Sequence, residues 1–171
     1  MLSDEQYICF HEASHALVCD ALGGEVTRIE LTSAGGGVTG VIVKDDKPDD
    51  YATVLAAGVA GEFFAAQWHQ YDASREQYLY LSTGRGDLAT FRTVKTVLTW
   101  EAAFNRAYEI LSKKPTRLFA LASQLERRGY IDGSDFRATM PVLDAIVNRA
   151  LTGGRSRAGM IRQQIRKWSE L

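Results

Sequence analysis

The sequence contains few cysteines, prolines and histidines, and it lacks both a long apolar run and an excess of one charge. Among 171 residues there are 2 cysteines, 3 prolines and 3 histidines, and the formal net charge is −1. This balance gives no whole-chain argument for binding nucleic acid or an acidic membrane surface. Hydrophobic residues make up 46% and charged residues 24%, which excludes a fibrous or disordered composition. We therefore expect one globular domain with a buried core.

The absence of targeting features predicts a cytoplasmic protein. No stretch of about 18 uninterrupted apolar residues occurs, so we expect no transmembrane helix. Residues 1–6 are polar and acidic, which argues against a secretory signal peptide. Cys9 and Cys19 would lie roughly 15 Å apart on one helix, too far for a disulfide within it. Both are expected to be reduced packing residues.

The spacing of apolar residues predicts a mainly helical fold with a small β-hairpin or sheet. Glycine and proline positions mark the ends of the predicted elements. We expect strands at 25–33 and 38–44 around a glycine-rich turn, and helices at 3–22, 51–70, from the turn at 82–88 through 100, 101–113 and 115–128. Residues 71–82 are expected to form a loop, and 132–135 to open a further short helix. Residues 1–150 are predicted to be the domain, and 151–171 a linker and basic C-terminal helix.

Two of the three histidines lie in the segment His11-Glu12-Ala13-Ser14-His15, an H-E-x-x-H pattern. On a helix, positions i and i+4 share a face, so both imidazoles could bind one zinc ion. The intervening Glu12 could then act as a base on zinc-bound water. The pattern also occurs by chance on metal-free surface helices. Apolar neighbours and the Gly23-Gly24 stop support a helix of four to five turns, which favours the metal site.

A catalytic zinc usually has three protein ligands and one open position. Three residues are candidates for the third ligand. Glu62 lies on a helix of small residues that could pack closely on the first helix, and Asp87 follows a glycine-containing turn at a helix start. His69 lies at a helix end, where exposure to solvent or a capping role is the simpler explanation. The residues alone leave this choice open.

The order of three segments resembles a known family. The histidine segment is followed by Ala57-Gly58-Val59-Ala60-Gly61-Glu62 and then by Ser82-Thr83-Gly84-Arg85-Gly86-Asp87-Leu88-Ala89-Thr90. This series is similar to the peptidase domain of the FtsH-type zinc metalloproteases of the M41 family, over roughly residues 5–138. The resemblance implies a zincin-like helical peptidase domain, with His11, His15 and Asp87 as zinc ligands. It also implies that Glu12 is the catalytic base and that Glu62 supports the site.

The sequence departs from that family at three points. Ser14 stands where the family has glycine, and Gly86 stands where it often has asparagine. The chain also has no phosphate-binding G-x-x-x-x-G-K-[ST] segment and no membrane span, so an AAA ATPase motor is not expected within it. Ser14 should press on whatever packs closely against that face of the helix.

These features predict a zinc metalloendopeptidase that hydrolyses flexible peptides or unfolded proteins. Its expected partners are the substrate and a separate ATPase or further copies of the chain, but no nucleic acid. The strand near residues 38–43 could pair with an extended substrate. The alternative is a non-enzymatic, peptidase-like binding or regulatory module that keeps the metal site. The intact Glu12 favours the enzyme, because a binding module has no need of a base.

Overall fold

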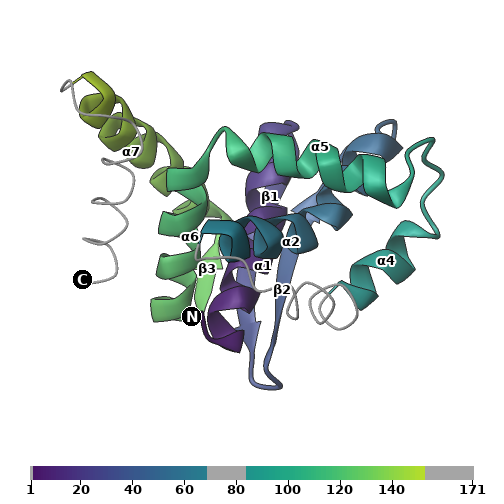
Figure 1. The fold of residues 1–171 in the computed structure, drawn as a ribbon, viewed down its shortest axis with the longest axis horizontal. Helices are drawn as coiled ribbons and strands as arrows, with labels where there is room; N and C mark the ends of the chain where they lie inside the picture. The colour runs from purple at the N-terminus through teal and green to yellow at the C-terminus, as the bar shows by residue number, and fades with distance from the viewer. Residues whose placement is uncertain (1, 69–83, 153–171) are drawn as a thin grey trace.

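The computed structural model describes residues 2–68 and 84–152. Within these ranges the fold is mainly helical, with one small antiparallel sheet, as the sequence predicted (Figure 1). The elements in chain order are α1 (Asp4–Ala21), β1 (Glu25–Thr32), β2 (Gly36–Ile42), α2 (Pro48–Trp68), α4 (Arg85–Phe91), α5 (Trp100–Ser112), α6 (Pro115–Arg128), β3 (Tyr130–Asp132) and α7 (Gly133–Thr152). No helix in the described ranges is long and apolar enough to cross a membrane.

Helix α1 is the central element of the fold. Its start is fixed by a capping box, in which the Ser3 hydroxyl accepts from the Gln6 N–H at 3.2 Å and the Gln6 side chain accepts from the Ser3 N–H at 2.9 Å. The sequence predicted one apolar face for this helix. In the structure every residue from Cys9 to Cys19 is buried, because α2, α6 and the β1–β2 hairpin pack around it.

Close packing between α1 and α2 depends on two glycines. A Cβ on Gly58 would lie 2.3 Å from Nε2 of His11, and a Cβ on Gly61 would lie 1.7 Å from Oγ of Ser14. Real Cβ atoms do not approach other atoms so closely, so larger residues at these positions would separate the helices. The predicted close approach of the small-residue helix is therefore confirmed, and Gly61 leaves the space that Ser14 occupies.

The sheet has the strand order β2-β1-β3. β1 pairs with β2 in antiparallel register, with Ile29 opposite Thr39. The turn of this hairpin projects beyond the helices (Figure 1). β3 was not predicted, because a strand of three residues is too short to show an alternating pattern; its Ile131 pairs with Ile29 on the other side of β1. β2 is consequently an edge strand among the described residues.

The helix predicted to run through Trp100 ends at Phe91, so that prediction was wrong. The intervening segment is held against α2 instead: the Thr96 hydroxyl and the Val97 N–H both donate to Oδ1 of Asp49, at 2.5 and 3.1 Å. Thr99 then caps α5 by accepting from the N–H of Ala102 at 3.1 Å. Apolar spacing alone does not distinguish one continuous helix from two helices, the second of which has its own N-cap.

The C-terminal elements follow the predicted boundaries at their starts. Pro115 begins α6, and Gly129 ends it with a φ of 67°, in the left-handed region that favours glycine. Asp132 accepts the N–H groups of Ser134 and Asp135 at 2.7 and 3.0 Å, as expected at a helix start. The helix that follows is not short, since α7 has 20 residues. Three predicted segments lie wholly or largely outside the described residues: the loop at 71–82, the linker near 152–156 and the basic tail. The domain boundary at residue 150 stays a prediction.

Candidate metal centre

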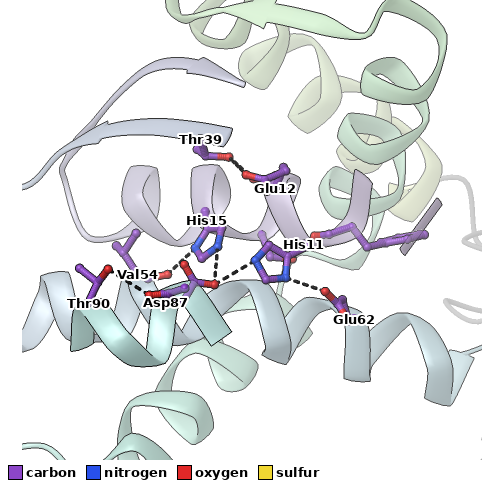
Figure 2. Close-up of polar contacts among 11 residues, drawn as sticks. His11, Glu12, His15, Thr39, Val54, Glu62, Asp87 and Thr90 are labelled. Atoms are coloured by element: carbon purple, nitrogen blue, oxygen red, sulfur yellow. Dashed lines mark hydrogen bonds and ion pairs between the residues drawn. The ribbon is translucent and has the colours of Figure 1, made fainter. Parts of the chain in front are cut away.

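Three predicted ligand side chains meet between α1, α2 and α4. His11 and His15 project from one face of α1, and Asp87 reaches them from the first turn of α4 (Figure 2). Oδ2 of Asp87 lies 3.0 Å from Nε2 of His11 and 3.4 Å from Nε2 of His15. One ligand atom from each residue lies within 4.8 Å of the other two. Both histidines are buried, and the Asp87 side chain is 21% exposed.

The other ring nitrogen of each histidine has a partner on α2. Nδ1 of His15 lies 2.7 Å from the backbone oxygen of Val54. A carbonyl oxygen only accepts, so Nδ1 carries the hydrogen and Nε2 keeps its lone pair when the ring is neutral. Nδ1 of His11 lies 2.6 Å from Oε1 of Glu62, whose side chain is fully buried. Both rings are thus oriented with Nε2 toward Asp87, as metal-ligating histidines are.

The charges of the site suit a cation. Burial would lower the pKa of His11, but its hydrogen bonds to Asp87 and Glu62 and their negative charges raise that pKa to about 10. Burial would raise the pKa of Asp87, but the hydrogen bonds and positive charges of His11 and His15 hold it well below its usual range. The two carboxylates therefore favour positive charge at the centre, which a protonated His11 supplies when no metal is bound.

Two of the three separations between the ligand atoms are close to those around a tetrahedral metal ion. Ligand bonds of about 2.0–2.2 Å at tetrahedral angles place neighbouring ligand atoms roughly 3.3–3.5 Å apart. The separations of Oδ2 of Asp87 from the two Nε2 atoms, 3.0 and 3.4 Å, are close to that range. Two imidazoles and one carboxylate are also a donor set used by catalytic zinc, which leaves a fourth position open. The residues present therefore fit such an ion.

Glu12 lies on the opposite side of α1 from Glu62 and faces β2 (Figure 2). Its Oε2 accepts a hydrogen bond from the Thr39 hydroxyl at 2.7 Å. A Cβ on Gly37 would lie 2.4 Å from Cγ of Glu12 and 2.7 Å from its Oε1, so the glutamate packs directly on the strand backbone. Only 5% of Glu12 is exposed. β2 thus restricts the position of this carboxylate.

A cleft of about 650 Å³ joins Glu12 to the three candidate ligands. β2 forms one of its walls, and α1, α2 and the start of α4 contribute the others. Val54 contacts His15, and Gly58, four residues later on α2, lies against His11. Helix α2 therefore runs antiparallel to α1 here. Apolar side chains also line the cleft, among them Val41, Tyr51, Val54 and Leu55.

Sequence reasoning named most of this site and missed part of it. His11, Glu12, His15, Asp87 and Glu62 all border the cleft, whereas His69 lies outside the described residues. Glu62 lies behind His11 and not among the three candidate ligands. Thr39 and the Val54 carbonyl were missed. A single threonine in a strand has no neighbouring pattern that predicts a contact with Glu12. A backbone carbonyl is present at every residue, so the sequence cannot single one out.

Comparison with known proteins supports a peptidase but not the predicted family. A family model described as Peptidase M50B-like matches residues 6–73, which are less than half of the chain. These residues include the H-E-x-x-H segment, the hairpin and α2, but not Asp87. A comparison with curated proteins found no match. The family match supports a metallopeptidase-type hydrolase in general.

The resemblance to the FtsH-type M41 peptidases is wrong, because the matching model belongs to a different metallopeptidase family. The structure offers a physical reason for the resemblance to that family. A metal-ligating histidine usually has an acceptor behind its ring, and the close approach of α2 to α1 leaves room only for small residues on α2. Gly58, Gly61 and Glu62 meet these needs in this chain. Such a spacing follows from the geometry of the site and does not identify one family.

Proposed function

We propose that this protein is a zinc-dependent metalloendopeptidase, with His11, His15 and Asp87 as the zinc ligands and Glu12 as the general base. The observation that carries this proposal is the convergence of the three ligand atoms beside a buried glutamate in one cleft. The Peptidase M50B-like match supports the same class of reaction. A bound zinc would polarise the scissile carbonyl and lower the pKa of a water molecule to about 7.

The chain's own residues would supply the proton transfers and the orientation. Glu12 would take a proton from the attacking water and deliver it to the amine that leaves. Glu62 and the Val54 carbonyl would hold the two imidazole rings with Nε2 toward the reaction centre. The low exposure of His11, Glu12 and His15 would strengthen these interactions by excluding bulk water.

The substrate is proposed to be an extended segment of a flexible peptide or unfolded protein. β2 borders the cleft and is an edge strand in the described part of the sheet. An edge strand presents backbone N–H and C=O groups that an extended peptide can pair with. The apolar side chains that line the cleft, such as Tyr51 and Leu55, would accept a hydrophobic side chain of such a substrate. A separate ATPase or further copies of the chain remain proposed partners.

Cleavage of an unfolded protein by the zinc-loaded chain tests this function. A reduced, carboxymethylated protein is a suitable substrate because it has no folded structure to be opened. We expect cleavage by the wild type and no cleavage by Glu12→Gln, which should retain its zinc. Glu30→Gln is the matched control, because Glu30 lies on β1 and does not border the cleft. Undiminished cleavage by Glu12→Gln would exclude Glu12 as the base.

The same experiment separates an enzyme from a binding module. A chain that binds zinc and an unfolded peptide but cleaves neither protein nor peptide would support the non-enzymatic alternative. Backbone pairing at β2 is tested with two peptides of one sequence, one of them N-methylated beside the cleavage site. We expect the methylated peptide to have the higher KM, because it cannot donate that hydrogen bond to the strand.

A further inference from the structure

We infer that Thr39 is a positioning residue for Glu12 and sets which of its two carboxylate oxygens accepts the proton from water. This inference rests on the proposed function. The Thr39 hydroxyl lies 2.7 Å from Oε2 of Glu12 and 3.0 Å from the backbone oxygen of the same residue. The hydroxyl has one hydrogen, and the shorter contact is to the charged acceptor, which forms the stronger bond.

The second contact of Glu12 with β2 restricts the rest of its side chain. Gly37 and Thr39 are two residues apart on the strand, so they face the same side of the sheet. Any side chain at Gly37 would collide with Cγ, Cδ and Oε1 of Glu12. The glutamate is therefore packed against the backbone at Gly37 and hydrogen-bonded at Thr39.

The hydrogen bond gives the two oxygens different tasks. Oε2 already accepts the hydrogen of the Thr39 hydroxyl, so one of its lone pairs is occupied. Oε1 receives no hydrogen bond from Thr39 and is the oxygen that takes the proton from water and later releases it to the leaving amine. Proton transfer is efficient only when the base is correctly placed. Thr39 thus acts on the reaction through Glu12 and need not touch the substrate.

The arrangement also links substrate binding to the base. β2 is the strand proposed to pair with an extended substrate, and its inward residues hold Glu12. The same strand would therefore contact the substrate along its edge and Glu12 on its inward side.

Three substitutions test the role of Thr39. Thr39→Val removes the hydroxyl and keeps the shape, and we expect kcat to fall about 10- to 100-fold, a part of the contribution of general base catalysis. KM should change less than about twofold, because Thr39 is not proposed to bind substrate. Thr39→Ser restores the hydroxyl and should recover most of kcat. Thr27→Val, on the exposed side of β1, is the matched control and should resemble the wild type.

Two measurements exclude a merely structural effect. The zinc dissociation constant of Thr39→Val, measured by competition with a chromophoric chelator, should equal that of the wild type. A crystal structure of Thr39→Val should show the Glu12 carboxylate rotated or in several positions.

The outcomes distinguish this inference from the proposed function. A wild type that cleaves, with Thr39→Val within twofold of its kcat, overturns the role of Thr39 and leaves the peptidase function intact. An equal loss in Thr39→Ser and Thr39→Val also overturns it, because the hydroxyl would then be irrelevant. A zinc-loaded wild type that cleaves no unfolded protein or peptide overturns both the function and the inference.

Discussion

Gly61 of α2 and Ser14 of α1 occupy complementary positions at the helix crossing beside the candidate metal centre. A Cβ on Gly61 would lie 1.7 Å from Oγ of Ser14 and 2.6 Å from its Cβ, and the Ser14 hydroxyl donates to the Phe10 carbonyl at 2.6 Å. The serine thus bonds to its own helix and fills the space that the glycine leaves. This contact sets how closely the two helices that carry and orient the histidines can approach.

Gly61→Ala should therefore destabilise the protein by about 1–3 kcal/mol through overpacking. Adding Ser14→Gly should recover part of this loss, although Ser14→Gly alone weakens the helix by roughly 0.5 kcal/mol. Urea unfolding of the two single variants and the double variant measures the coupling. Strictly additive free energies of unfolding would show that the two residues do not share the space inferred here.

Gly58→Ala should affect the metal more than Gly61→Ala does. The added methyl group would lie 2.3 Å from Cε1 and Nε2 of His11, so the ring would have to shift from its position beside Asp87. We expect both variants to lose stability, but Gly58→Ala to lose at least about tenfold more zinc affinity. Chelator competition on the two folded variants makes the comparison. Equal zinc affinities would contradict the assignment of His11 as a ligand.

Glu62→Gln should weaken zinc binding about 10- to 100-fold, as loss of an outer partner of a ligating histidine typically does. The amide preserves the shape and the acceptor oxygen, but it removes the negative charge that lies 2.6 Å from Nδ1 of His11. Glu62→Ala should weaken binding further, because the ring then has no acceptor. Zinc dissociation constants are the measurement, and unchanged values in both variants would remove Glu62 from the site.

Zinc binding near pH 7 should release about one proton from His11. The pKa of His11 is raised to about 10 in the metal-free fold, so its ring is protonated at pH 7, and zinc needs the lone pair of Nε2. Calorimetric titration in two buffers of different ionisation enthalpy counts the protons. Binding without proton release would show that His11 is already neutral or is not a ligand.

The raised pKa of His11 also makes the free energy of unfolding of the metal-free protein depend on pH. The folded pKa, about 10, exceeds the ordinary value of 6.5. The stabilisation from charged His11 is therefore complete below about pH 6.5 and is lost as the pH rises through 10. Urea unfolding of metal-free protein at pH 7 and pH 9 should show this decrease, and His11→Gln should reduce it.

The sequence predicted the parts of the site that depend on residue type and spacing along one helix. Two histidines four residues apart must share a face, and small residues at Gly58 and Gly61 permit close helix packing. The contacts that depend on three-dimensional placement were not predictable in the same way. Thr39 meets Glu12 only because β2 crosses over α1, and the end of α4 at Phe91 depends on contacts with Asp49, more than forty residues earlier.

The proposed zinc site depends on Asp87 as the third ligand beside His11 and His15. The most direct measurement is the zinc stoichiometry and affinity of Asp87→Ala beside Glu101→Ala, a matched loss of an acidic residue from the first turn of an exposed helix start. We predict one zinc per chain in the wild type and in Glu101→Ala, and at least about 10- to 100-fold weaker binding in Asp87→Ala. Zinc binding by Asp87→Ala that is as tight as that of the wild type would contradict the claim.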